Sequence, residues 1–402
     1  MIGDILDTAI PIVIFFLILG VVVTVHELGH FIMARRAGIF VKEFALGMGP
    51  KLLTIRGKKK TAYPIEDEDD VTHFTLRLFP IGGFCAVRGQ DDEMPDDPEA
   101  MGNKSIPQRA WFMLGGSVFN FIAALVLFFI LSLLTGYNVP QIYDFSDITV
   151  ATVSHYNENN EPVFELSQVP SPVRVAGLMP GDRITHINGT RVSLWASFRF
   201  LLDTSGGLPI DVRVNRGGQS MNFTVTPVLG ASNIYQVGFI MSHRVGWLQD
   251  VPEGDRFMRV GIWGSLVYAA DTIVFHVRMP FRMLAMLATG QSIPGGGGVM
   301  GPIGIAGIVT EVYQVTSERG FIDTLIPMLS LTAMISVALG IMNLLPIPAL
   351  DGARLLFLAI EAIRRKPVSQ EREGMVHIVG FVILIALGIF IAYRDIVNLI
   401  AS

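Results

Sequence analysis

Four long apolar stretches dominate the pattern of hydrophobic and polar positions along the chain. They cover residues 10–33, 110–135, 324–350 and 375–393. A bilayer core about 30 Å thick requires about 20 mostly apolar residues in a helix, and each stretch approaches or exceeds that length. The pattern therefore predicts a polytopic α-helical membrane protein with four transmembrane helices.

The segments between these stretches complete a predicted division of the chain. A strand-rich domain is expected where short alternating strands follow one another, with Asn188-Gly189 as a hairpin turn. A region of aromatic residues, Met and scattered Arg follows it and suggests interfacial amphipathic helices. The predicted parts are a first helix (1–34), a loop (35–109), a second helix (110–135), the strand-rich domain (145–230), the amphipathic region (231–323), a third helix (324–352), a loop (353–374) and a fourth helix with the tail (375–402).

Composition agrees with a membrane protein. The 402 residues are 51% hydrophobic and only 16% charged, whereas soluble domains carry about 25% charged residues. The mean hydropathy is +0.51. A net charge of −5 without a basic stripe argues against a nucleic-acid partner. The single cysteine, Cys85, excludes an internal disulfide, so any metal must be held by His, Asp or Glu.

The distribution of Lys and Arg predicts the orientation in the membrane. The first loop carries twelve of them within 34–109, including Arg35 and Arg36, and the short loop before the fourth helix includes Arg364, Arg365, Lys366 and Arg372. The long second loop also carries twelve, but over about 190 residues and without lysine. The positive-inside rule then places loops 35–109 and 353–374 in the cytoplasm, with both termini and the long loop outside. The first stretch lacks a basic region before it and is predicted to be retained.

The first loop contains a predicted β-hairpin. Residues 73–79 alternate in character, Pro80, Gly82 and Gly83 indicate a turn, and 84–87 form the expected return strand. Two interpretations remain open. The hairpin is either a small soluble element, or it dips toward the membrane with an edge free for pairing.

The sharpest chemical signal is His26-Glu27-Leu28-Gly29-His30. On a helix, positions i and i+4 share one face, so both imidazoles can bind one zinc ion beside Glu27 as general base. Ionisable residues in a membrane cost at least about 2.5–3.5 kcal/mol each, which argues for a functional reason. The site is expected about 24 Å along the first helix, toward its inner end. The alternative is a helix that ends at Val25.

A third zinc ligand is expected from a distant segment. Asp351 follows Pro346 and Pro348, which break the third helix near the same predicted membrane face as His26. Freed carbonyls at that depth must line a wet cavity or lie within protein. The alternative is that Asp351 merely caps a following helix. Neither His276 nor His377 has ligand spacing, and no role in a metal site is predicted for them.

Together these motifs resemble the site-2 protease family of intramembrane zinc metalloproteases, in particular the bacterial branch that cuts anti-sigma factors. The resemblance covers nearly the whole chain, including a PDZ-like stretch at 145–230. It implies zinc ligation by His26, His30 and Asp351, with Glu27 as catalytic base. It also implies a membrane-reentrant β-hairpin that pairs with an extended substrate by strand addition. The implied substrate-binding residues are Asn343, Asn120, Phe74, Leu76, Gly82 and Gly83.

The resemblance implies a bacterial inner-membrane enzyme that hydrolyses single-span membrane proteins, such as anti-sigma factors or signal-peptide remnants. Three features depart from the family pattern: Ser117, Ala353 and one PDZ-like domain where many relatives carry two. Whether that domain binds peptides or filters substrates by size stays open. The alternative function is a catalytically silent membrane scaffold that recruits partners through the PDZ-like domain.

Overall fold

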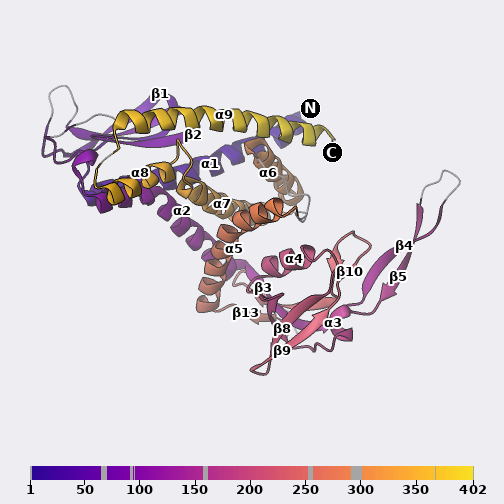
Figure 1. Ribbon diagram of the computed structural model, residues 1–402. Coiled ribbons are helices and arrows are strands. Elements are labelled where there is room, and N and C mark those ends of the chain that lie inside the picture. Colours follow the sequence, from indigo (N-terminus) through magenta and orange to yellow (C-terminus); the bar gives the residue numbers. More distant parts are fainter. Residues whose placement is uncertain are drawn as a thin grey trace. The chain divides into compact units, whose positions relative to one another are not determined.

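The computed structural model describes residues 2–64, 70–90, 94, 96–156, 162–251, 257–290, 301–366 and 368–401 (Figure 1). The chain forms two compact units. One comprises residues 1–127 and 298–402, and the other comprises residues 128–297. The first unit holds most of the long helices, and the second holds most of the strands.

Long apolar helices form the frame of the first unit. Four of them are long and apolar enough to cross a membrane, over Ala9–Ala37, Ile106–Thr135, Phe321–Leu344 and Glu371–Val397. This confirms the prediction of four apolar spans. The helices of this unit are α1 (Ile2–Ala37), α2 (Ile106–Thr135, which continues into the second unit), α6 (Pro302–Ser317), α7 (Phe321–Leu344), α8 (Asp351–Arg364) and α9 (Gln370–Ala401).

The helices pack through apolar side chains. Val22 of α1, Val309 of α6 and Met328 of α7 belong to one buried cluster. The third apolar stretch does not continue to residue 352 as one helix. It ends at Leu344, and α8 begins at Asp351, because Pro346 and Pro348 lie between them. The predicted break is therefore confirmed.

A sheet made of β1 (Val41–Lys60) and β2 (Val71–Val87) follows α1. Both elements fold back on themselves, so that Glu43 lies opposite both Ala86 and His73. Segment 43–46 therefore lies between 83–86 and 73–76. Segment 43–46 pairs with 83–86 in antiparallel register. Its pairs with 73–76 run in the same direction along both segments, from Glu43 with His73 to Leu46 with Leu76. Residues 53–56 pair with the other side of 73–76.

This arrangement corrects the predicted hairpin. Residues 84–87 do not return along 73–79, because 43–46 separates the two segments. The strands of β1 were not predicted. Gly47 and Gly49 have φ angles of +84° and +83°, which allow the chain to turn sharply inside β1.

The second unit is built on a mixed sheet. Its strands run in the order β13-β12-β3-β6-β8-β9, and β7 pairs with β6. Helix α4 (Trp195–Asp203) buries Phe198 and Leu202 in the core against this sheet. The strands are β3 (Gly136–Phe145), β6 (Arg183–Ile187), β7 (Thr190–Arg191), β8 (Ile210–Arg216), β9 (Gln219–Val225), β12 (Phe239–Val245) and β13 (Phe257–Arg259).

Smaller elements complete this unit. Two strand pairs lie outside the main sheet, and α5 (Ile262–Ala288) is its long helix. The remaining elements are β4 (Ile148–Tyr156), β5 (Pro162–Val169), α3 (Pro172–Val175), β10 (Val228–Leu229) and β11 (Tyr235–Gln236).

Two predicted boundaries differ from this structure. The sheet includes β3 before residue 145, and β12 and β13 after residue 230, so the range 145–230 is too narrow for it. Within the predicted amphipathic region 231–323, residues 235–259 contain strands rather than a helix. These assignments depend on pairing between strands that lie more than 90 residues apart in the sequence. Such pairing leaves no periodic pattern in the local sequence.

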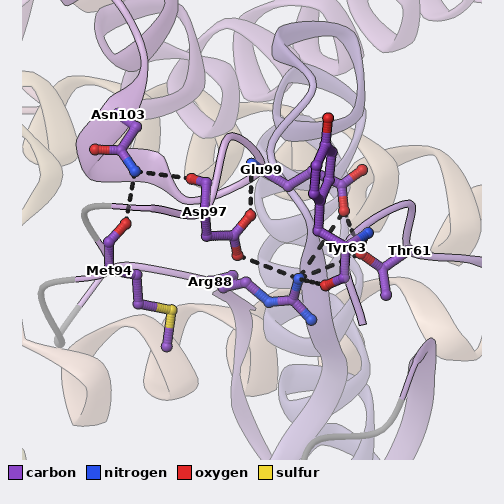
Figure 2. A network of polar contacts seen from close by, with 7 residues as sticks. All are labelled: Thr61, Tyr63, Arg88, Met94, Asp97, Glu99 and Asn103. Atoms are coloured by element: carbon purple, nitrogen blue, oxygen red, sulfur yellow. Dashed lines mark hydrogen bonds and ion pairs between the residues drawn. The ribbon is translucent and has the colours of Figure 1, made fainter. Parts of the chain in front are cut away.

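A buried arginine supports the sheet of the first unit (Figure 2). Arg88 directly follows β2 and is 0% exposed. Its guanidinium donates to the Tyr63 carbonyl at 2.8 Å, to Thr61 Oγ1 at 3.2 Å and to Asp97 Oδ2 at 3.2 Å. It also lies 4.4 Å from the ring centroid of Phe40. The network ties the end of β2 to the chain on both sides of it.

We expect Arg88→Met to lower the midpoint of thermal unfolding of the detergent-purified protein. Removing one partner of a buried ion pair leaves Asp97 uncompensated, which costs about 3–5 kcal/mol. Arg364→Met is the matched control, because Arg364 is exposed at the end of α8. Equal midpoints for the two variants would show that the Arg88 network does not stabilise this region.

Candidate metal centre and active site

Three side chains from two distant helices converge on one point. Nε2 of His26 and Nε2 of His30 are 3.2 Å apart, and Oδ2 of Asp351 lies 3.2 and 3.1 Å from them. His26 and His30 share one face of α1, and α1 continues past them to Ala37. The alternative of a helix ending at Val25 is therefore wrong.

The donor set fits a zinc ion. Zinc bound at about 2.0–2.1 Å in a tetrahedral site has ligand atoms about 3.3 Å apart. The three atoms here form a nearly equilateral triangle with sides of 3.1–3.2 Å. Two imidazoles and one carboxylate leave a fourth position open, as catalytic zinc sites require.

Hydrogen bonds at the far side of each ring orient the imidazoles. Nδ1 of His30 donates to the Phe112 carbonyl at 2.9 Å, which leaves Nε2 free to bind metal. The amide of Asn120 lies 3.3 Å from Nδ1 of His26. Nδ2 of Asn120 faces the ring here. Rotating the amide by 180° would place Oδ1 there to accept the N–H that a metal-bound Nε2 leaves on Nδ1. Asn120 is fully buried.

Glycines allow α2 to approach the metal ligands. A Cβ on Gly116 would lie 2.4 Å from Cε1 of His26 and 2.6 Å from Nε2 of His30. At the residues directly before His30 and Gly116, a Cβ on Gly29 would lie 2.2 Å from the carbonyl oxygen of Gly115. Small residues at such contacts let helix backbones meet closely in a membrane. Gly116 therefore leaves the space that the two imidazoles occupy.

The segment before Asp351 is tightly turned. Asp351 is the first residue of α8, after the N-cap residue Leu350, and its Oδ2 lies beside the two imidazoles. Ala349 has a φ of +76°, which is uncommon for a residue with a side chain. Its N–H donates to Nδ1 of His377 in α9 at 2.9 Å. His377, which the sequence did not connect to the site, thus holds the backbone two residues before the predicted ligand.

Glu27 lies between the metal ligands and the sheet. The backbone N–H of Cys85 donates to its carboxylate. A Cβ on Gly83 would lie 3.2 Å from Cγ of Glu27, so Gly83 brings the strand against this side chain. Segment 83–86 pairs on one side with 43–46 and has no second strand partner among the described residues. This edge therefore faces the predicted base.

A cavity of about 260 Å³ joins these groups. It brings Asn343 together with the metal ligands, while Asn120 contacts His26 from behind. The Asn343 amide donates to the Leu339 carbonyl at 3.1 Å. The lining residues are His26, Glu27, His30, Phe84, Cys85, Gln90, Phe112, Met113, Asn343, Ala349, Leu350, Asp351 and Arg354.

Among the other predicted substrate-binding residues, some lie beside the groups of this cavity and others lie elsewhere on the sheet. Gly83 contacts Glu27, and Gly82 lies at a turn with a φ of +78°. Leu76 is exposed and pairs with Leu46 and Leu53. Phe74 lines a separate cavity. Gln90 and Arg354 line the catalytic cavity although no sequence pattern pointed to them.

The sequence matches a known family over most of its length. Residues 14–387 match Peptidase family M50. The chain belongs to this family. It is a metalloprotease of the site-2 protease type. Its family and its four apolar helices point to an inner-membrane protein.

Similar proteins match nearly the whole chain. A Clostridium acetobutylicum protein whose name describes a zinc metalloprotease is 31% identical over 387 residues, which are 96% of this chain and 97% of that relative. Zinc metalloprotease RasP of Geobacillus kaustophilus is 28% identical over 97% of this chain and 98% of its own length. The Bacillus subtilis "Regulator of sigma-W protease RasP" is 28% identical over 96% and 98%.

One solved structure also resembles part of the chain. The PDZ domain of EpsC from Vibrio cholerae, residues 219–305, aligns with 19% of this chain and 93% of that domain. The sequence identity is 18% and the TM-score is 0.13. A similarity at that level assigns no fold to the second unit.

We expect Gly116→Ala to abolish zinc binding, because the added methyl group collides with both imidazoles. The zinc content per chain is measured by mass spectrometry on detergent-purified protein. Gly388→Ala in α9 is the matched control, since a Cβ there meets no atom within 4 Å. Retention of zinc in Gly116→Ala would contradict the described packing of α2 against the site.

Cys85 offers a second test of the cavity. Burial raises the pKa of its thiol, and the nearby Glu27 carboxylate raises it further. The reactive thiolate is therefore scarce at neutral and mildly alkaline pH. We expect alkylation of the folded protein at pH 8 to be much slower than after denaturation. Cys85 is the single cysteine, so the label reports on this position alone; equal rates would contradict the burial.

Proposed function

We propose that this M50 metalloprotease binds zinc through His26, His30 and Asp351 and hydrolyses peptide bonds within or near transmembrane segments. The observation that carries the proposal is the convergence of these three ligands within an apolar helix frame. Their ligand atoms all lie within 4.8 Å of one another. The proposed ligands of α1 lie inside the candidate span Ala9–Ala37, which supports chemistry at membrane depth.

Glu27 is the proposed catalytic base. A bound zinc ion supplies the Lewis acidity that polarises the scissile carbonyl and makes water acidic. Glu27 accepts the proton from the attacking water and later delivers it to the departing amine. The Cys85 N–H orients Glu27 by its hydrogen bond, and the missing side chain of Gly83 leaves room for Glu27 beside the strand.

The substrate is proposed to bind in an extended form. A transmembrane helix hides its carbonyl groups in hydrogen bonds and must unwind before water can attack. The edge of segment 83–86 beside Glu27 can replace those hydrogen bonds by strand addition. Asn343 is proposed to contact the unwound backbone, and Gly82, Gly83, Phe74 and Leu76 to support the extended strand. The sheet of β1 and β2 that contains these residues is proposed to be membrane-reentrant.

The proposed partners are single-span membrane proteins, such as anti-sigma factors or signal-peptide remnants. The name of the Bacillus subtilis relative, a regulator of sigma-W protease, supports a regulatory substrate. The Lys and Arg distribution supports a cytoplasmic placement of the sheet and of loop 353–374, with both termini outside. The domain around 145–230 is proposed to be an extracytoplasmic PDZ-like filter of substrates rather than a catalytic part.

The decisive test separates metal binding from catalysis. We expect about one zinc ion per chain in the wild type and strong loss in His30→Ala and Asp351→Ala. Glu27→Gln should retain zinc but lose at least about 100-fold in cleavage of a single-span reporter protein, because general base catalysis is removed. Zinc is measured by mass spectrometry and cleavage by gel electrophoresis.

His155→Ala is the control for histidine removal, because His155 is exposed in the second unit. It should leave zinc content and cleavage unchanged. Full cleavage by Glu27→Gln with zinc bound would refute the assigned base. Zinc that is indifferent to both ligand substitutions would refute the site and favour the non-catalytic scaffold.

A further inference from the structure

A second cavity lies at the end of α1, apart from the proposed catalytic residues. Its volume is about 560 Å³. Residues of α1 form one wall, and residues of the β1–β2 sheet form the other. The lining residues are Phe31, Ile32, Arg35, Arg36, Gly57, Lys58, Thr72 and Phe74. All of them belong to the first unit.

The charged side chains described at this cavity are all positive. Arg35, Arg36 and Lys58 are exposed at it, and the described residues that line it include no Asp or Glu. None of the three forms an ion pair with an acid among the residues that the structure describes. The end of a helix carries only about half a negative charge. Three full positive charges outweigh it, so the cavity attracts anions.

The remaining lining is mostly apolar. The rings of Phe31 and Phe74 are 5.6 Å apart, and both lie close to Phe44, at 5.5 and 6.1 Å. Arg35 lies 5.8 Å from the Phe31 ring centroid. Thr72 also lines the cavity and is 1% exposed, and its Oγ1 has no hydrogen-bond partner within the described part of the chain. The cavity thus combines a cationic rim with an aromatic wall.

The position of the cavity matches the headgroup layer of a bilayer. Arg35 and Arg36 occupy the last turn of α1. The candidate span Ala9–Ala37 has 29 residues, and at 1.5 Å per residue it is about 43 Å long. The hydrocarbon core is about 30 Å thick. The end of α1 therefore reaches the headgroups of one leaflet, whichever way the helix crosses the membrane.

We propose that this cavity binds an anionic phospholipid. The headgroup phosphate lies among Arg35, Arg36 and Lys58, and an acyl chain lies against Phe31 and Ile32. Phosphate is the chemistry that the three cations recognise. The aromatic wall and the membrane depth distinguish a phospholipid from free inorganic phosphate, which has nothing to place against apolar side chains. This site does not depend on the proposed protease function.

The test uses the full-length protein in detergent and native mass spectrometry. Phosphatidylglycerol is titrated against wild type, Arg35→Gln/Lys58→Gln and the control Arg364→Gln/Lys366→Gln. Both double variants lose two exposed positive charges, and the control residues lie outside the cavity. Each basic side chain near an anionic headgroup contributes about fivefold in affinity, so the cavity variant should bind roughly thirtyfold more weakly. The control should bind like the wild type.

Two further measurements test whether the ligand is an anionic phospholipid. Phosphatidylcholine with the same acyl chains should bind more weakly than phosphatidylglycerol and should not distinguish the variants. Millimolar inorganic phosphate should not displace the bound lipid. Equal loss of lipid in both double variants would overturn the proposal in favour of unspecific charge attraction. Displacement by inorganic phosphate would overturn it in favour of a simple anion site.

Discussion

The structure of the first unit depends on three ligand atoms meeting inside an apolar frame. His26 and His30 come from α1, and Asp351 comes from the start of α8, more than 320 residues away. Placing an ionisable side chain at membrane depth costs free energy unless a partner of opposite charge compensates it. A metal ion meets that requirement for all three at once. The break after α7 is then necessary, because a continuous helix could not present Asp351 at this point.

Close helix contact is the second condition for the site. The backbones of α1 and α2 approach each other at Gly29 and Gly115, and Gly116 leaves the volume that the two imidazoles occupy. This approach lets the Phe112 carbonyl and Asn120 reach the far nitrogens of the rings. The same packing that joins the helices therefore also sets the tautomer of His30 that leaves its Nε2 free for a metal ion.

The sheet connects the metal centre with the loop that follows it. Cys85 and Gly83 contact Glu27, and Arg88 anchors the next turn of the chain by its buried hydrogen bonds (Figure 2). Glu27, the proposed base, thus lies between α1 and a strand edge. The proposed binding of an unwound substrate segment would use the backbone of this edge. The same sheet also lines the cationic cavity, through Gly57, Lys58, Thr72 and Phe74.

The sequence by itself determined the parts that depend on local spacing. Apolar length predicts the four spans, and the i, i+4 pair His26 and His30 with Glu27 predicts the metal site. Proline chemistry predicts the break before Asp351. Only the tertiary structure decided the place of segment 43–46 between two others, and the contacts of Gly116, Arg88 and His377. These depend on backbones that meet across long sequence separations, where neither hydrophobic period nor motif spacing carries a signal.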